Sequence, residues 1–213
     1  MSRDTTTLVT MDGLHLDADV RTADTDVVVR GGVVIAHPHP LYGGDRYNPV
    51  VTSLFEHLPT LGFHTVRFDF RGVNSSEGEH DGGTGERLDV ASAVDFLDRL
   101  VDSERDEEIW VAGYSFGAAV GLTVVEPRIA GWIAVAPPLS PENRYPCAVD
   151  PRPKFLVVPR HDQFCPPESL AASTIDWTET EATVVESADH FLNGHIDVVA
   201  RRVGDWLRRR VSA

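Results

Sequence analysis

One short segment of this chain has the residue types that a serine nucleophile requires. Residues 109–112 (IWVA) form an apolar run, which stops at residues 113–117 (GYSFG) and continues into small residues that favour a helix. This pattern is typical of a buried strand that turns sharply into a helix, with Ser115 at the turn. The backbone at such a turn is strained, and Gly113 and Gly117 let strand and helix approach closely. The serine hydroxyl is therefore expected to project from the edge of a sheet.

A serine hydroxyl is a weak nucleophile at neutral pH. Ser115 therefore needs a base that takes its proton and a third group that orients the base. A Gly-x-Ser-x-Gly motif also arises by chance in about one chain in twenty of this length, given ordinary glycine and serine usage. The rest of the sequence must supply the two partners and the elements that position them.

Length and composition favour a single α/β domain that spans residues 1–213. A chain of 213 residues, 42% of them hydrophobic, is long enough for one sizeable core and too short for two full domains with linkers. It has no run of about twenty apolar residues, and its first residues lack the apolar segment of a signal peptide. We therefore expect a cytoplasmic protein with no membrane partner.

The charge of the chain excludes some partners. Its formal net charge of −14 argues against binding to nucleic acid or anionic membranes, because both would be repelled. Asp and Glu number 33, whereas Lys154 is the only lysine. This pattern resembles proteins from salt-accumulating halophilic archaea; an ordinary acidic protein from a GC-rich genome is the alternative. Cys147 and Cys165 are too few for a disulfide framework and lack metal-ligand spacing.

Alternating strands and helices are expected to position the serine. A tight turn at Asp12 and Gly13 predicts an N-terminal hairpin, so the sheet begins antiparallel. Further strands are expected at 33–36, 64–70, 109–112, 131–135, 155–158 and 183–185. Helices are expected at 48–61, 88–101, after Ser115, at 167–175 and from 196. This alternation implies a mostly parallel, twisted sheet with helices on both faces, a three-layer αβα sandwich.

The chain resembles the α/β-hydrolases over nearly its whole length. Besides the GYSFG turn, it has a rigid loop at residues 37–44 (HPHPLYGG) after an early strand, and candidate acid and histidine residues follow later strands in the family's order. The loop and the short chain are similar to compact members near the dienelactone-hydrolase and serine-aminopeptidase-like branches. Ser115 departs from dienelactone hydrolases proper, whose nucleophile is cysteine. The resemblance implies the α/β-hydrolase fold without a cap domain, because residues 139–154 are too few for one.

The resemblance also assigns the two partners of Ser115. It identifies Asp162 as the orienting acid, although the family usually has a glycine where this chain has Pro159. It identifies His190 as the general base, because a small residue and an acid commonly precede that histidine. A neutral imidazole can accept the serine proton and return it to a leaving group, while the acid fixes its tautomer. The alternatives are a solvated loop aspartate at 162 and His195, which we interpret as a surface residue.

The same resemblance places an oxyanion hole beside the serine. Two backbone N–H groups would form it, one from Phe116 and one from residues 39–42. Leu41 is favoured in this loop because Pro40 has no N–H.

Four further residues near these motifs have predicted roles. Tyr42 and Tyr114, which border the loop and the serine, are predicted to bind substrate. His37 forms an H-x-H pair with His39, and such a pair can bind metal. No other ligand cluster accompanies this pair, so a scaffold or packing role is predicted, with neither metal nor cofactor.

These residues predict a serine hydrolase that cleaves a carboxylic ester or thioester of a small or exposed acyl group through an acyl-enzyme on Ser115. A small-molecule acyl substrate is the expected partner, and the oligomeric state is left open. An aminopeptidase-like peptidase is one alternative, which an acidic pocket for a substrate amine would support. A non-catalytic binding module is another, because fold alone does not establish chemistry. Such modules typically lack a triad residue, whereas all three candidates are present here.

Overall fold

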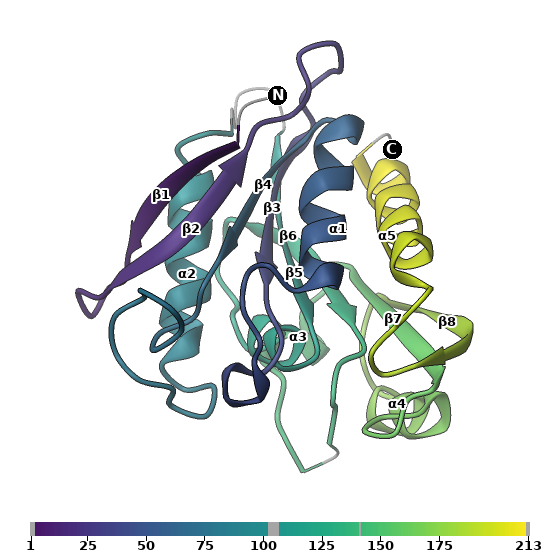
Figure 1. Cartoon of the computed structure of the whole chain (residues 1–213). Helices are drawn as coiled ribbons and strands as arrows, with labels where there is room; N and C mark the ends of the chain where they lie inside the picture. The colour runs from purple at the N-terminus through teal and green to yellow at the C-terminus, as the bar shows by residue number, and fades with distance from the viewer. Residues whose placement is uncertain (1–2, 102–106, 141, 212–213) are drawn as a thin grey trace.

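The computed structural model describes residues 3–101, 107–140 and 142–211, whose strands form one eight-stranded sheet (Figure 1). The strands are β1 (Arg3–Val9), β2 (His15–Arg21), β3 (Gly31–Ala36), β4 (Phe63–Phe68), β5 (Glu108–Tyr114), β6 (Ile129–Val135), β7 (Lys154–His161) and β8 (Thr180–Asp189). The helices are α1 (Pro49–His57), α2 (Glu86–Leu97), α3 (Phe116–Gly121), α4 (Pro167–Ser173) and α5 (Ile196–Val211), with 3₁₀ helices η1 (Pro40–Tyr42), η2 (Leu58–Leu61) and η4 (Pro146–Val149).

The order of the strands is β1-β2-β4-β3-β5-β6-β7-β8. β2 pairs antiparallel with β1 and with β4, and each later pair is parallel. The first turn contains Gly13 at a φ of +87°, a conformation that glycine adopts without strain. The predicted fold class, a mostly parallel sheet with an antiparallel N-terminal hairpin, is confirmed.

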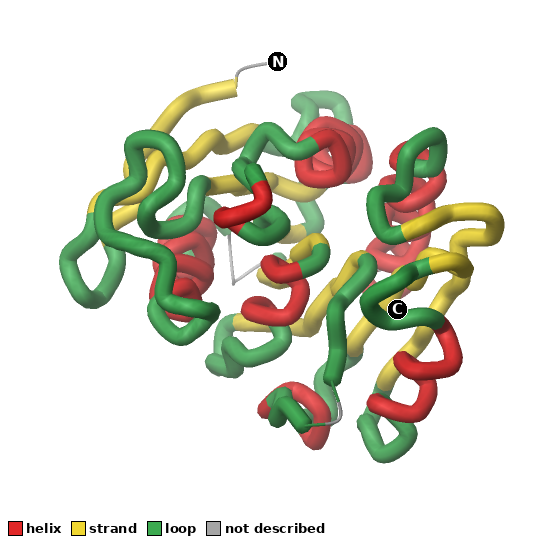
Figure 2. The backbone as a smooth tube through the Cα atoms, turned by 60° about the horizontal axis from the view of Figure 1, so that its bottom comes forward, coloured by secondary structure: helices red, strands yellow, loops and turns green. Residues whose placement is uncertain are grey.

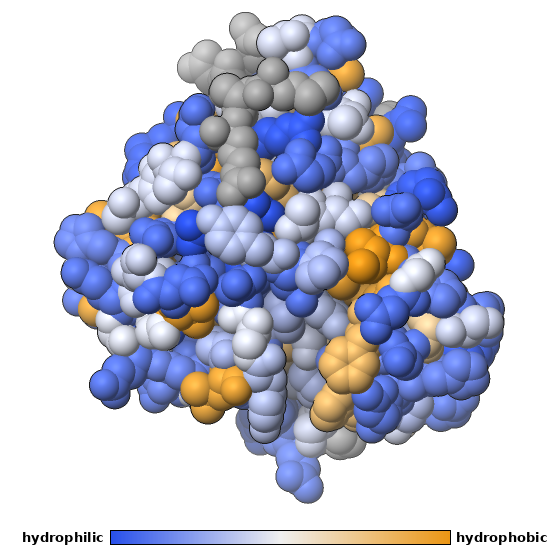
Figure 3. All heavy atoms as spheres, viewed as in Figure 1, coloured by the Kyte–Doolittle hydropathy of each residue, from blue (hydrophilic) through white to orange (hydrophobic). Residues whose placement is uncertain are grey.

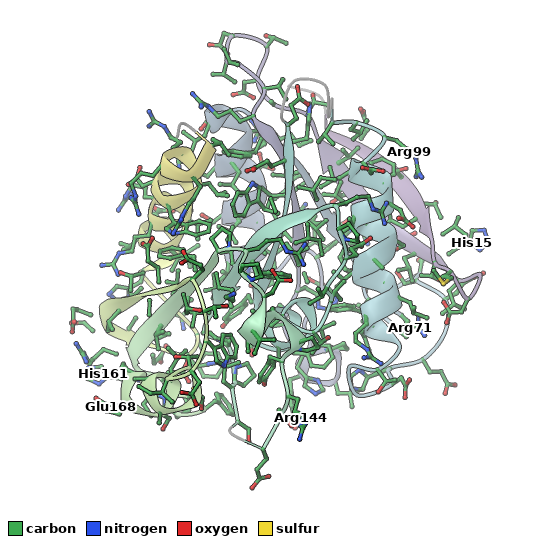
Figure 4. All side chains as sticks on the ribbon, turned by 180° about the vertical axis from the view of Figure 1, so that it is seen from behind. His15, Arg71, Arg99, Arg144, His161 and Glu168 are labelled. Atoms are coloured by element: carbon green, nitrogen blue, oxygen red, sulfur yellow. The ribbon has the colours of Figure 1, made fainter. Side chains whose placement is uncertain are left out.

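Helices cover both faces of the sheet, as the three-layer prediction requires. Helices α1 and α5 pack on one face, where Leu54 and Val203 belong to the same hydrophobic cluster. The other face carries α2, α3 and α4, with Val94 and Leu170 in a second cluster (Figure 4). The sheet is therefore shielded on both sides, and its strand ends remain the places where loops can build a site.

Two predicted helices differ from the observed ones in their bounds. The expected helix at 48–61 ends at His57 and continues as η2, because Pro59 cannot continue an α-helix. The expected helix at 88–101 is α2, which ends at Leu97. Beyond it, the N–H groups of Leu100 and Val101 both donate to the Leu97 carbonyl, at 2.8 and 3.0 Å, so the chain tightens into a turn. Leu100 is consequently 39% exposed instead of facing the core.

The loops at the carboxyl ends of the parallel strands lie at one end of the molecule, which faces the reader in Figure 2. Between β6 and β7 the described residues form only one helical turn, η4, and no cap domain. Among residues 3–101, 107–140 and 142–211, no helix combines the length and the apolar character needed to span a bilayer. The face shown in Figure 3 is mostly hydrophilic, with separate small hydrophobic patches.

Lys154, the only lysine, anchors the loop before β7. Its side chain is buried, and Nζ donates to the carbonyl oxygens of Cys147, Asp150 and Arg152 at 3.0, 2.6 and 2.8 Å. An ammonium group has three donors, so these contacts can satisfy it fully. Lys154 thus ties η4 and the following residues to the sheet.

Replacing Lys154 with methionine should lower the free energy of unfolding by about 2–3 kcal/mol, because three carbonyl oxygens lose a charged donor while the volume is kept. Urea unfolding followed by circular dichroism measures the change. Arg208→Met, at an exposed position of α5, is the control and should change stability by less than about 0.5 kcal/mol. Equal stability of the Lys154→Met and wild-type proteins would contradict this anchoring role.

Candidate active site

The sharp turn predicted at Ser115 lies between β5 and α3. Ser115 has a φ of +53° and a ψ of −117°, a strained conformation for a residue with a side chain. A Cβ on Gly113 would lie 2.4 Å from the carbonyl carbon of Gly117, and one on Gly117 would lie 2.5 Å from the Ala36 oxygen. Strand, helix and β3 therefore meet at distances that only glycine permits. The Ser115 N–H donates to the Val135 carbonyl at 2.9 Å, which fixes the turn to β6.

The structure brings the three predicted triad residues together. The Ser115 hydroxyl lies 2.9 Å from Nε2 of His190, and Nδ1 of His190 lies 2.8 Å from Oδ2 of Asp162. The serine follows β5, the aspartate follows β7 and the histidine follows β8. Carboxyl ends of parallel strands share one edge of a sheet, so residues far apart in the chain meet there. This chain of hydrogen bonds can move the serine proton to His190.

The carboxylate of Asp162 is buried and oriented by backbone donors. Its side chain accepts hydrogen bonds at Oδ1 from the N–H groups of Phe164 and Cys165, at 2.8 and 3.1 Å. The other oxygen is left for His190. Asp162 is 3% exposed and His190 is 5% exposed, so water hardly competes for this contact.

Pro159, which replaces the glycine expected before the acid, is accommodated inside β7. The pairing of β6 with β7 ends at Val157, and Pro159 lies beyond it. Although proline has no N–H, this position costs the β6–β7 pairing no hydrogen bond. The pairing of β7 with β8 shifts register between Pro159 and His161. A bulge of this kind redirects the chain, here just before Asp162.

Tyr114 differs from its predicted role in substrate binding. It is 4% exposed, and its hydroxyl donates to the backbone carbonyl of His190 at 2.8 Å. Its ring stacks on the imidazole with centroids 5.8 Å apart. Burial raises the pKa of Tyr114, so the phenol stays a neutral donor. Tyr114 thus holds the backbone of the His190 loop, a role that its place inside a buried strand could not reveal from sequence.

The N–H of Leu41, the predicted oxyanion donor, has an acceptor in the structure. Its N–H donates to Nδ1 of His39 at 3.2 Å, which caps η1. The N–H of His39 makes no hydrogen bond with any residue that the structure describes. The His39 ring lies 4.9 Å from that of Phe116, whose own N–H, at the first position of α3, has no partner within the helix. The geometry therefore favours His39 over Leu41.

His37 is a scaffold residue whose ring nitrogens are both used. Nδ1 lies 2.6 Å from the Pro38 carbonyl, and Nε2 accepts the N–H of Phe70 at 3.0 Å. The imidazole is fully buried, and this burial lowers the pKa of His37 to about 4, so the ring is neutral. His37 thus attaches the loop of His39 to the end of β4. Within the described ranges, no group of three or more His, Cys, Asp or Glu side chains could hold a metal ion.

An exposed apolar rim surrounds the triad, and sequence reasoning missed most of it. Phe164 and Phe191 are 61% and 56% exposed, with ring centroids 4.5 and 5.8 Å from that of His190. Both residues lie next to triad positions in the chain, which was the available signal. Tyr42, predicted to bind substrate, is 87% exposed and stands against the His39 ring at 4.8 Å. His195 makes contacts within its own turn and no contact with the triad.

Comparisons with known proteins agree with this fold. The sequence model of the alpha/beta hydrolase family matches residues 27–212, and the chain therefore belongs to this family. An alpha-beta serine hydrolase homologue from Coxiella burnetii is 30% identical, with a TM-score of 0.83 and coverage of 99% of this chain and 98% of that chain. A serine hydrolase without a lid from Xanthomonas campestris is 26% identical, with a TM-score of 0.87 and coverage of 100% and 97%.

A curated relative, an uncharacterised protein from Rickettsia prowazekii, is 27% identical over 188 residues, which cover 82% of this chain and 77% of that protein. The resemblance to compact, lidless α/β-hydrolases is confirmed by the family match and the structural neighbours. Fold and neighbours together support hydrolase activity.

Replacing Tyr114 with phenylalanine should lower the free energy of unfolding by about 1–2 kcal/mol and reduce kcat severalfold, because the buried His190 carbonyl loses its donor. Steady-state kinetics and urea unfolding measure the two effects. Tyr42→Phe, which removes an exposed hydroxyl, is the matched control and should leave stability unchanged. Wild-type kcat in Tyr114→Phe would show that the contact does not hold the histidine.

Acidification should destabilise the protein through His37. The folded-state pKa is depressed to about 4, so between pH 4 and about 6.5 the unfolded state binds more protons, and stability falls as pH falls through this window. Between pH 7.5 and 5 the wild type should lose about 2 kcal/mol more than His37→Gln, as measured by urea unfolding at both values. His195→Gln, at a half-buried position, is the control and should keep the wild-type dependence of the unfolding free energy on pH. If the unfolding free energy depended on pH equally in wild type and His37→Gln, the prediction would be contradicted.

Proposed function

We propose that this chain is a serine hydrolase that cleaves a carboxylic ester or thioester through an acyl-enzyme on Ser115. The observation that carries the proposal is the hydrogen-bond chain from the Ser115 hydroxyl through His190 to Asp162, with distances of 2.9 and 2.8 Å. The strained turn supports it, because the φ and ψ of Ser115 together lie outside the regions that residues with a side chain ordinarily adopt, and such strain clusters at functional sites.

In the acylation step, Oγ of Ser115 attacks the carbonyl carbon of the substrate while Nε2 of His190 takes the hydroxyl proton. The imidazolium that forms is stabilised by the buried carboxylate of Asp162, which also keeps Nδ1 protonated in the resting enzyme. When the tetrahedral intermediate collapses, the alcohol or thiol leaves with the proton from Nε2. An ester bond to Ser115 remains.

In the deacylation step, water takes the place of the leaving group. His190 removes a proton from this water as its oxygen attacks the acyl carbon, and the serine oxygen then leaves with that proton. The products are the carboxylic acid and the free Ser115 hydroxyl. The same histidine thus acts as base and acid in both steps.

The oxyanion of each tetrahedral intermediate is assigned to the backbone N–H groups of Phe116 and His39. A rigid pair of donors stabilises this charge because the protein need not reorganise during the reaction. The loop of His39 is attached through His37 and through Arg46, whose N–H donates to Asp69 at 2.8 Å. These contacts support donors that are in place before substrate binds.

An open site suits small or exposed acyl groups. No cap domain covers the triad among the described residues, and the rim of Tyr42, Phe164 and Phe191 offers exposed apolar surface to one part of a substrate. A small-molecule acyl substrate is therefore the proposed partner. The cytoplasmic location and the halophilic source stay predictions.

A peptidase is a second candidate, with one observation in its favour. A cleft of about 430 Å³ borders Pro40 and Leu41 and is also lined by Asp45 and Glu79. Such carboxylates could receive the amine of a peptide N-terminus. Asp45 already accepts the N–H of Tyr47 at 2.9 Å, so its carboxylate is partly engaged. For this reason ester hydrolysis is the first choice.

A fluorophosphonate probe should label the wild-type protein at one serine, and Ser115→Ala should abolish the labelling. Intact mass spectrometry at low and high salt measures it. With 4-nitrophenyl acetate and butyrate, Ser115→Ala and His190→Ala should lose at least about 10³-fold in kcat, and Asp162→Asn a similar amount, because the histidine then takes the wrong tautomer.

The variant His195→Ala, which replaces a histidine outside the proposed triad, is the control and should keep wild-type activity. Aminoacyl 4-nitroanilides, tested beside the esters, separate the two candidates: faster cleavage of the anilides would favour the peptidase. Folded wild-type protein that neither reacts with the probe nor cleaves any of these substrates would contradict a catalytic triad and favour a binding module.

A further inference from the structure

A second pocket is lined by Phe116, the residue that follows Ser115. It has a volume of about 420 Å³, within the range of small-molecule sites. Phe116 and Val120 of α3 supply apolar surface, and other walls come from residues 82–84 and Arg87 and, after β6, from Pro138 and residues 143–145. Three segments distant in sequence therefore combine to form it.

The charge of this pocket is opposite to that of the whole chain. Arg87 and Arg144 line it, and no Asp or Glu does, although acidic residues outnumber basic ones by 33 to 19. Other arginines near this end of the sheet have carboxylate partners, as Arg46 has in Asp69. Neither Arg87 nor Arg144 makes an ion pair with any described residue; Nε of Arg87 donates to the Thr84 carbonyl at 3.2 Å. The terminal nitrogens of both guanidinium groups thus remain open to a ligand.

The position of the pocket relates it to the proposed reaction. Phe116 directly follows Ser115, so one wall of the pocket begins about 3.8 Å along the backbone from the nucleophile. The Phe116 ring also lies 4.9 Å from the ring of His39, the other proposed oxyanion donor. Arg144 lies on the loop after β6, at the same end of the molecule as α3 (Figure 4). Phe116 therefore links the pocket to the turn that carries Ser115.

We infer that this pocket binds an anionic group of the substrate, a carboxylate or a phosphate, through Arg87 and Arg144. The inference rests on the proposed function, since it names the class of ester or thioester that Ser115 cleaves. Two guanidinium groups suit either anion because each presents paired N–H donors to two oxygens. Asn143, which also lines the pocket, adds an amide that can donate to the same anion. With a neutral substrate both exposed guanidinium groups would stay hydrated.

The kinetic test compares mono-4-nitrophenyl adipate, which carries a carboxylate, with its neutral methyl ester. Wild-type kcat/KM should be higher for the anion. Each of Arg87→Gln and Arg144→Gln should lower the value for the anion by about threefold to fivefold, and the double variant by about tenfold or more, because the guanidinium groups are exposed enough for partial screening. The neutral ester should change less than twofold. The ratio of kcat/KM for the anionic ester to that for the neutral ester should fall between 0.1 and 1 M salt.

Arg208→Gln is the matched control, because Arg208 is an exposed arginine on α5, far from the pocket lining. It should leave both substrates unchanged. Cleavage of both esters with the same kcat/KM in wild type and in the double variant would overturn the inference and leave the proposed hydrolase intact. Circular dichroism establishes that the variants are folded.

A binding test is independent of catalysis. Monomethyl adipate and methyl phosphate are titrated into Ser115→Ala and followed by NMR of the arginine Nε–H groups, with dimethyl adipate as the neutral control. Saturable shifts that vanish in the Arg87→Gln/Arg144→Gln background support the anion site even if the wild type cleaves no ester. Shifts with monomethyl adipate alone assign a carboxylate, and shifts with methyl phosphate alone assign a phosphate. Absence of saturable shifts with both anions would overturn the site.

Discussion

The backbone of Ser115 has a positive φ, and most of the site depends on how the fold keeps it there. A residue with a side chain in this conformation costs about 1–3 kcal/mol. The cost is offset by the hydrogen bond from Ser115 to Val135 and by the close packing of Gly113 against Gly117. Strands β3, β5 and β6 therefore all contribute to one torsion angle. Without this constraint the hydroxyl would not stand 2.9 Å from the imidazole of His190.

The loops around the serine are held by buried polar contacts, because they have few apolar residues to bury. His37 bonds to the backbone at both ring nitrogens, and Arg46 contacts the buried carboxylate of Asp69, which also accepts from Asn74 at 2.8 Å. Buried ion pairs add little net stability, since desolvation opposes their attraction. Their effect here is geometric: they define where the loop of His39 lies relative to α3. On the other side, backbone N–H groups do the same for Asp162.

Because no cap domain encloses the proposed site among the described residues, substrate selection there would depend on the surface around the triad candidates. Exposed rings at Phe164 and Phe191 provide apolar contact beside the histidine. Two clefts of opposite charge flank the oxyanion loop and α3, one lined by Asp45 and Glu79 and the other by two arginines. Charge close to the reacting carbonyl can therefore discriminate among substrates where enclosure is absent. The strength of this selection depends on ionic strength, because both clefts are accessible to salt.

Local features of the sequence determined the alternating fold and the turn at Ser115, the proposed nucleophile. The apolar run before Ser115 and its two flanking glycines are adjacent in the chain, so residue types alone predicted the turn. The triad partners required the resemblance to a family, because Asp162 and His190 meet Ser115 only through the order of parallel strands.

Tertiary structure alone decided the features that depend on long-range contacts. From sequence, Leu41 is predicted to be an oxyanion donor and Tyr114 to be a substrate contact. In the structure the Leu41 N–H donates to the His39 ring, and the Tyr114 hydroxyl donates to the backbone carbonyl of His190. The arginine-lined pocket unites segments near residues 85, 120 and 143, which no sequence pattern connects. The physical reason is the same in each case. The role of a polar group is set by its hydrogen-bonding and charged neighbours, and those neighbours come from distant parts of the chain.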